Sequence, residues 1–250
     1  MKRFNKLSAI AFLSMIVLMS FNIPARKIRV YLVGDSTMSI KQVSKYPETG
    51  WGMPFANFFD ESITVDNRAQ NGRSTKSFMA EGRWKSVTDS LKAGDYVFIQ
   101  FGHNDEVKTK KTYTTEEEFK NNLAKYVSES LKAGAFPVLI TPVARRNFDT
   151  EGKVLPTHQV YSEIVRTLSR EMKVPLIDLD KESMALLQKM GVENSKLLFN
   201  KLEPGQNPNY PAGVDDNTHF NEYGARRMAE LVLLELRKMN LELANRIVKH

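Results

Sequence analysis

A serine, a histidine and an aspartate in this chain have the types and spacing required for nucleophilic catalysis. The stretch 33–39 (VGDSTMS) follows an apolar run, 28–33, that is broken only by Arg29. The Ser36 hydroxyl would attack a carbonyl at neutral pH only with a base within reach, and that base needs an orienting partner. Taken alone, Ser36 is explained equally well as the capping serine of a strand-to-helix turn.

The base must come from a small set of histidines. We expect His219 to be the base, because Asp216 lies three residues before it in the polar loop 215–220 (DDNTHF), where a carboxylate can fold back onto Nδ1. Asp215 is less suitably spaced, and an Asp-x-x-His pattern alone usually marks a capped helix start. The other histidines are His103, which either takes part in catalysis or braces its loop, His158, expected at the surface of a helix start, and the terminal His250.

Acyl transfer also needs hydrogen-bond donors aimed at the developing oxyanion. The candidates are the backbone N–H groups of Ser36 and Gly72 and the side-chain amide of Asn104. Each of the last two, taken alone, is typical of a turn. Gly72 and Asn104 can therefore act as oxyanion donors only if the fold brings them close to Ser36.

The arrangement of apolar runs predicts a fold that does so. Short strands are expected at 28–33, 63–67, 96–101, 137–141 and 174–178, and they alternate with helical segments. This pattern predicts an α/β, three-layer α/β/α sandwich with a five-stranded parallel sheet, similar to flavodoxin. Because the carboxyl ends of parallel strands share one edge, we expect the three oxyanion candidates to meet there.

The last third of the chain has weaker signals. The segment 181–190 has helical spacing and is expected to end at Gly191. The segment 193–214 is rich in Asn, Pro and Gly and is expected to be irregular. A final helix is expected over about 221–248.

The amino terminus resembles a secretory signal. Lys2, Arg3 and Lys6 precede an uncharged apolar run, 7–21, which is shorter than the ~20 residues of a membrane span. We therefore expect a signal peptide over 1–25, followed by one domain over 26–250, and an exported, periplasmic or extracellular monomer. An uncleaved amino-terminal anchor is the alternative.

Composition narrows the chemistry. The chain has no cysteine, which excludes disulfides, thiol catalysis and thiolate metal sites. The formal net charge is +7, and removal of the three amino-terminal cations leaves +4. This mild excess is compatible with acidic partners. The chain has no basic cluster interleaved with aromatic residues, so no nucleic-acid partner is expected.

Four sequence blocks together resemble a known family. They are GDS at 34–36, Gly72, GHND at 102–105 and DNTH at 216–219, in the order of the SGNH (GDSL-type) hydrolases. The stretch GDSTMS, with GWG at 50–52 and NGRST at 71–75, is most similar to the rhamnogalacturonan acetylesterases. The resemblance covers nearly all of the chain after residue 25.

This resemblance implies a function. Ser36 would be the nucleophile, His219 the base and Asp216 its orienting partner, with Ser36, Gly72 and Asn104 forming the oxyanion hole and no metal or cofactor required. The substrate would be an O-acetylated acidic pectic poly- or oligosaccharide. Trp51, Arg73, Arg145 and Arg146 are the substrate-binding candidates, the arginines because guanidinium groups pair with uronate carboxylates.

Three other interpretations stay open. The first is another SGNH esterase, acting on xylan, other acetylated sugars, lipids or thioesters. The second is a carbohydrate-binding protein without catalysis, which a complete Ser-His-Asp set disfavours. The third is a metal hydrolase using His103, Asp105, Asp216 and His219, which lack a compact metal-ligand motif.

Overall fold

A parallel sheet forms the centre of the protein. The computed structural model describes residues 26–248, so the expected signal peptide lies outside the described residues. The strands are β1 (Ile28–Gly34), β2 (Ile63–Asn67), β3 (Tyr96–Gln100), β4 (Phe136–Ile140) and β5 (Leu176–Ile177). They are all parallel, in the order β2-β1-β3-β4-β5, which confirms the predicted five-stranded sheet.

Strand β1 shows why the sheet is buried on both faces. Successive side chains of a strand point to opposite faces. Val30 and Leu32 belong to one hydrophobic cluster, while Tyr31 and Val33 belong to another. An apolar run without alternation is therefore what this position requires.

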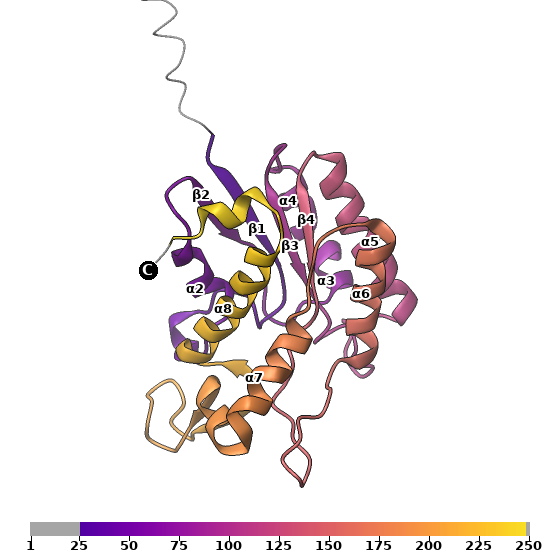
Figure 1. Ribbon diagram of the computed structural model, residues 1–250. Coiled ribbons are helices and arrows are strands. Elements are labelled where there is room, and N and C mark those ends of the chain that lie inside the picture. The colour runs from indigo at the N-terminus through magenta and orange to yellow at the C-terminus, as the bar shows by residue number, and fades with distance from the viewer. Residues whose placement is uncertain (1–25, 249–250) are drawn as a thin grey trace, which may run out of the picture.

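Helices cover both faces of the sheet, as Figure 1 shows. The cluster that contains Leu32 includes residues of α2 (Gly52–Phe55), α7 (Leu179–Asn194) and α8 (Glu222–Lys238). The cluster that contains Val33 includes residues of α3 (Thr75–Ala80), α4 (Arg83–Thr88), α5 (Glu116–Lys132) and α6 (Gln159–Met172). The three-layer α/β/α architecture is thus confirmed.

The expected final helix is shorter than predicted. Helix α8 ends at Lys238, because Met239 has extended backbone angles. Short 3-10 turns complete the chain: η1 (Val43–Lys45), η2 (Ala56–Phe58), η3 (Ser195–Leu198) and η4 (Glu242–Arg246). Gly191 breaks the helical geometry of α7 with a φ of 73°, although the element continues to Asn194.

The region after α7 differs from the prediction. Segments expected to be irregular form β6 (Phe199–Leu202) and β7 (Val214–Phe220), which pair antiparallel in a second, small sheet. The polar segment 215–220, predicted to be a loop, is therefore entirely strand. This hairpin lies at the lower end of the molecule in Figure 1, below α8.

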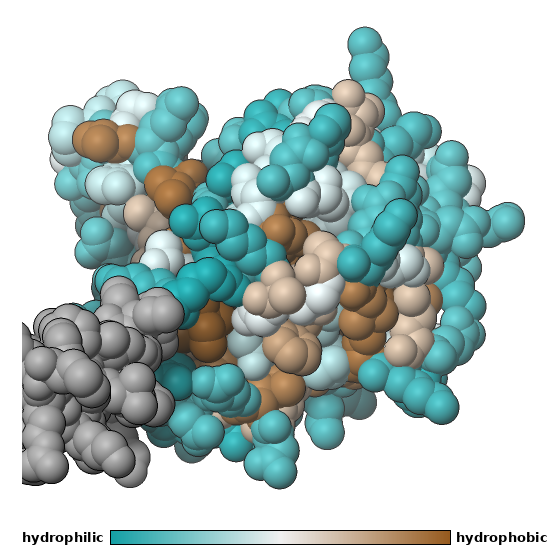
Figure 2. Space-filling view, turned by 90° about the horizontal axis from the view of Figure 1, so that it is seen from above, coloured by the Kyte–Doolittle hydropathy of each residue, from teal (hydrophilic) through white to brown (hydrophobic). Residues whose placement is uncertain are grey.

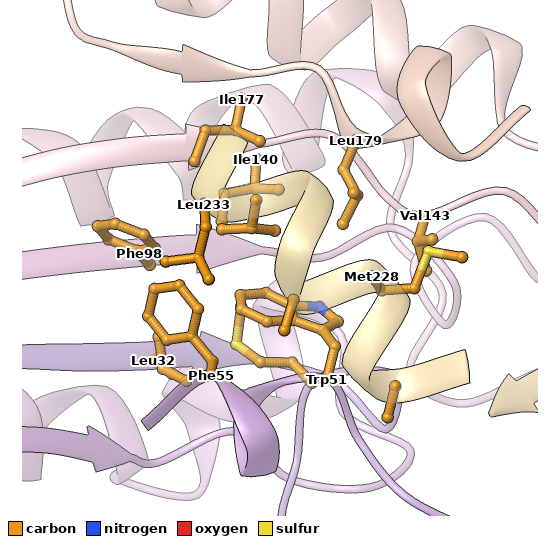
Figure 3. Close-up of a cluster of buried hydrophobic side chains, with 14 of the residues drawn as sticks. Leu32, Trp51, Phe55, Phe98, Ile140, Val143, Ile177, Leu179, Met228 and Leu233 are labelled. Carbon is orange, nitrogen blue, oxygen red and sulfur yellow. The ribbon is translucent and has the colours of Figure 1, made fainter. Parts of the chain in front are cut away.

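Trp51 is a core residue, so its predicted role in substrate binding is wrong. Its side chain is 0% exposed. It packs edge-on against Phe55, with ring centroids 5.5 Å apart, and lies among the apolar side chains of Figure 3. Its indole N–H donates to Gln100 Oε1 at 2.7 Å, which satisfies the only polar atom that burial would otherwise leave unpaired.

The surface has mixed character. Figure 2 views the molecule from above, and on that face hydrophilic residues surround small hydrophobic areas. Within 26–248, no helix is both long and apolar enough to cross a bilayer.

Candidate active site

Ser36 lies in a turn directly after the central strand β1. Asp35 fixes this turn, because its Oδ1 accepts hydrogen bonds from the Thr37 N–H at 2.9 Å and the Thr37 hydroxyl at 2.8 Å. Burial raises the pKa of the Asp35 carboxyl, against the lowering effect of the Thr37 bonds. Ser36 itself is 9% exposed, which leaves its hydroxyl at the edge of the buried turn.

The three residues predicted to form a catalytic set are in contact. Ser36 Oγ lies 2.9 Å from His219 Nε2, and His219 Nδ1 lies 2.7 Å from Asp216 Oδ2. The other oxygen, Asp216 Oδ1, accepts the backbone N–H groups of Thr218 at 2.6 Å and His219 at 3.0 Å. The Asp216 carboxylate therefore holds both the ring and the backbone of the histidine.

The charge state of Asp216 suits an orienting role. Burial acts to raise its pKa, but the hydrogen bonds from His219 and Thr218 outweigh burial and lower it to about 2. An ionised Asp216 accepts a hydrogen bond from His219 Nδ1–H, so the Nε2 lone pair faces the serine hydroxyl. This arrangement permits general-base activation of Ser36.

Gly72 is tied to the other two oxyanion candidates through its neighbours. Asn71, on one side, accepts hydrogen bonds from Ser39 in the serine turn. On the other side, the Arg73 carbonyl accepts from Asn104 Nδ2 at 3.1 Å. The structure thus brings the loops of Ser36, Gly72 and Asn104 together at the carboxyl edge of the sheet.

The orientation of the Asn104 amide is fixed. Lys110 Nζ donates to its oxygen at 3.0 Å, which turns the nitrogen toward the Gly72 loop. One amide hydrogen bonds the Arg73 carbonyl, and the second remains as a donor. Gly72 has a φ of +74°, a conformation that L side chains adopt only with strain.

The three arginines predicted to bind substrate already have protein partners. Arg73 pairs with Glu81 at 3.0 Å. Arg145 donates to Thr218 Oγ1 at 3.0 Å and lies 3.6 Å from Glu106, so it links the Asn104 loop to β7. Arg146 donates to Ser195, Asn217 and the Val192 carbonyl, which fixes its guanidinium beside the β6–β7 hairpin.

The two remaining described histidines lie inside the protein. His103 and His158 are 3% and 1% exposed, with ring centroids 4.2 Å apart, so the surface position expected for His158 is wrong. Burial lowers the pKa of His103 well below its usual value. The imidazole that contacts Ser36 belongs to His219, whereas the His103 ring packs against His158.

Two residues beside the nucleophile escaped the sequence-based prediction. Lys41 is buried and donates to the Ser36 carbonyl, and Asn71 shares this lysine. A lone lysine in a polar loop is typical of a solvated side chain, so no sequence signal pointed to it.

A large cavity lies on the hairpin. Its volume is about 830 Å³, and its lining includes Arg146, Lys196, Lys201, Asp215 and Asn217. Asn217 adjoins Asp216 along β7, but the lining does not include Ser36 or His219. Across residues 26–248, no group of three or more side chains is suitably clustered to hold a metal ion.

Comparison with known proteins identifies the family. The model of the GDSL-like Lipase/Acylhydrolase family matches residues 32–227, which contain every block described above. The chain belongs to the GDSL-like lipase/acylhydrolase family. This GDSL-like hydrolase is an esterase, and the predicted relationship to the rhamnogalacturonan acetylesterases is confirmed by its relatives.

The curated relatives that carry this name include one bacterial and one fungal protein. The chain is 39% identical over 224 residues to the rhamnogalacturonan acetylesterase RhgT of Bacillus subtilis (strain 168), covering 89% of this chain and 95% of the relative. It is 47% identical over 76 residues to a rhamnogalacturonan acetylesterase of Emericella nidulans, covering 30% and 28% of the two chains.

Solved structures share the fold. Protein YXIM of Bacillus subtilis has a TM-score of 0.76 at 27% identity, covering 88% of this chain and 59% of that one. An acetylxylan esterase of Geobacillus stearothermophilus has a TM-score of 0.62 at 17% identity, covering 90% and 98%.

Proposed function

We propose that this GDSL-like hydrolase is an exported carbohydrate acetylesterase that removes O-acetyl groups from rhamnogalacturonan-type pectic polysaccharide or its oligosaccharides. The observation that carries the proposal is the Ser36–His219–Asp216 hydrogen-bonded chain in a protein 39% identical to a rhamnogalacturonan acetylesterase. The basic residues and apolar run of the amino terminus support export.

The chemistry proceeds through an acyl-enzyme. Ser36 Oγ attacks the acetyl carbonyl while its proton passes to His219 Nε2. The carbonyl oxygen becomes an oxyanion, stabilised by the N–H groups of Ser36 and Gly72 and the free amide hydrogen of Asn104. When the carbonyl reforms, the sugar oxygen leaves and takes the proton from His219.

Water completes the cycle. His219 removes a proton from a water molecule, which attacks the acetyl-Ser36 ester and forms a second tetrahedral intermediate. Collapse of this intermediate releases acetate and returns the proton to Ser36 Oγ. Asp216 remains ionised throughout, consistent with its low pKa.

The test measures acetate release by the protein from acetylated rhamnogalacturonan, acetylated xylan and p-nitrophenyl esters of increasing chain length. The proposal predicts the highest kcat/KM on the pectic substrate and on acetyl among the synthetic esters. Faster turnover of acetylated xylan would make the protein a xylan acetylesterase. Faster turnover of esters with long acyl chains would make it a lipid esterase.

Ser36→Ala is the decisive variant. We expect kcat/KM on p-nitrophenyl acetate to fall by roughly 10⁴- to 10⁶-fold, as for other serine hydrolases that lose the nucleophile. Ser44→Ala is the matched control, since Ser44 is an exposed serine in the following loop. A Ser36→Ala variant that a fluorophosphonate still labels would refute the mechanism.

A further inference from the structure

Lys41 is the only buried lysine of residues 26–248, and it lies beside the proposed nucleophile. Lys41 Nζ donates to the Ser36 carbonyl at 2.6 Å and to Asn71 Oδ1 at 2.8 Å. The same nitrogen lies 2.7 Å from Glu48 Oε1. An ammonium group has three hydrogens, so these three oxygens match its full donor capacity.

Ser39 reinforces two of these contacts. Its hydroxyl lies 2.5 Å from Asn71 Oδ1 and 3.4 Å from the Ser36 carbonyl. The two acceptors on neighbouring loops are therefore joined by two donors, Ser39 Oγ and Lys41 Nζ. We call Ser39, Lys41, Glu48 and Asn71 the clasp.

The clasp joins the two loops that supply backbone donors to the proposed oxyanion hole. One end holds the carbonyl of Ser36, whose own N–H is the first donor. The other end holds Asn71, the residue directly before Gly72, whose N–H is the second. A change in the clasp would therefore alter the spacing between these donors.

Burying a lysine at this position carries a large desolvation penalty. Removing an ammonium group from water costs several kcal/mol unless it is paired and hydrogen-bonded. Burial lowers the pKa of Lys41, whereas the hydrogen bond and charge of Glu48 raise it. The Glu48 carboxylate is itself only 14% exposed, so the two charges neutralise each other inside the protein.

We propose that Lys41 is a positioning residue that fixes the Ser36 and Gly72 loops at the spacing the oxyanion requires, with Ser39 and Asn71 as its partners. Lys41 acts through the backbone and forms no bond to the ester. This proposal rests on the proposed ester hydrolysis at Ser36, but not on the identity of the sugar.

The test compares Lys41→Met with Lys45→Met on p-nitrophenyl acetate, a substrate that needs no sugar subsite. Lys45 is an exposed lysine of the same loop, so its variant should retain activity. We expect Lys41→Met to lower kcat by roughly 10- to 100-fold with little change in KM, because small displacements of reacting groups cost up to ~10²-fold. The rate of fluorophosphonate labelling should fall with kcat.

Three further variants separate positioning from stability. Lys41→Met/Glu48→Gln removes the carboxylate charge that Lys41→Met leaves unpaired, and should fold better while remaining slow. Asn71→Ala breaks the clasp without burying a charge, and should lower kcat on its own. Because both substitutions break the same link, Lys41→Met/Asn71→Ala should be little slower than either single variant.

The outcomes are distinguishable. Folded Lys41→Met/Glu48→Gln or Asn71→Ala with wild-type kcat would overturn the clasp, whatever its effect on thermal stability. If Lys41→Met does not fold, Lys41→Met/Glu48→Gln and Asn71→Ala decide. A wild-type protein inactive on every ester would instead overturn the proposed function.

Discussion

The two halves of the candidate site are built in different ways. Ser36, Gly72 and Asn104 follow neighbouring strands of the central sheet, and partly buried hydrogen bonds connect their loops. Asp216 and His219 lie on the β6–β7 hairpin, outside that sheet. The nucleophile and its oxyanion donors are thus positioned by the core, whereas the base depends on a peripheral element.

Phe199 and Phe220 anchor the hairpin in the hydrophobic core, and hydrogen bonds attach it to the sheet edge. The Thr49 N–H donates to the Phe220 carbonyl at 2.8 Å, and Arg145 reaches Thr218. In the loop between β6 and β7, the Tyr210 hydroxyl donates to the Lys45 carbonyl at 2.8 Å. Disturbing the hairpin should therefore impair proton transfer through His219 more than it disturbs the packing of the core. Variants on the two sides of the site test this difference.

The largest effect is expected on the hairpin side. Asp216→Asn should lower kcat by roughly 10³- to 10⁴-fold, because a neutral amide no longer selects the histidine tautomer whose Nε2 accepts a proton. Asp215→Asn is the matched control, since its side chain is 83% exposed and points to Lys201. Equal losses in both variants, measured with p-nitrophenyl acetate, would show that Asp216 has no special role.

Two carboxyl groups should give the halves opposite pH behaviour. Burial raises the pKa of Asp105 at the sheet edge to about 7, against its bonds from Thr75 and Thr114. Since its folded pKa lies above the unfolded value of 3.8, stability is full below pH 3.8 and declines as the pH rises through 7. Asp216 contributes stability above pH 3.8 that is lost toward its pKa of about 2.

Asp105→Asn should remove the decline between about pH 4 and 7, a change on the order of 4 kcal/mol in unfolding free energy from a shift of about three pKa units. In Asp216→Asn, the decline in stability between about pH 4 and 7 should remain. Urea unfolding at a series of pH values measures both, and a slope that survives in Asp105→Asn would contradict the assignment.

A matched pair of glycines compares backbone strain in the two halves. Gly72 and Gly205 have φ values of +74° and +82°, and an added Cβ would meet open space at both. Substitution of either glycine by alanine should lower the free energy of unfolding by about 1–2 kcal/mol. Only Gly72→Ala should also lower kcat, by roughly 10- to 100-fold, because a displaced N–H weakens oxyanion binding. Equal activity in the two variants would remove Gly72 from the oxyanion hole.

The smallest effect concerns hairpin attachment. Tyr210→Phe removes the hydrogen bond to the Lys45 carbonyl. This should weaken the local attachment of the hairpin by about 1 kcal/mol. We expect faster proteolysis within 203–213 and a fall in kcat of less than about 5-fold, with the midpoint of thermal unfolding almost unchanged. A large loss of global stability would show that the hairpin belongs to the cooperative core.

The sheet edge was predictable because its signals are local and strong. Apolar runs followed by Gly-Asp-Ser and Gly-His-Asn-Asp indicate buried strands ending in functional turns, and parallel topology then brings these turns together. The hairpin was missed because 214–220 (VDDNTHF) carries residues with low strand propensity. Its pairing with β6 supplies what the local sequence does not indicate.

Individual side chains show a second limit. Trp51 and Lys41 lie ten residues apart, and sequence reasoning placed the tryptophan at the substrate and overlooked the lysine. Both are buried, and a partner distant in sequence accepts a hydrogen bond from each: Gln100 from Trp51, and Asn71 from Lys41. Such partners become visible only when the chain is folded.

The position of β1 between β2 and β3 has a consequence for how the site can change. The proposed oxyanion donors follow three adjacent strands, and neighbouring strands lie ~4.8 Å apart by backbone hydrogen bonding. The sheet thus fixes the spacing of the strand ends, and the clasp then sets the positions of the loops that follow them. Segments outside the sheet and the clasp, such as 203–213, have no such fixed spacing. Selection for a new leaving group would therefore act on those segments while the acetyl side keeps its dimensions.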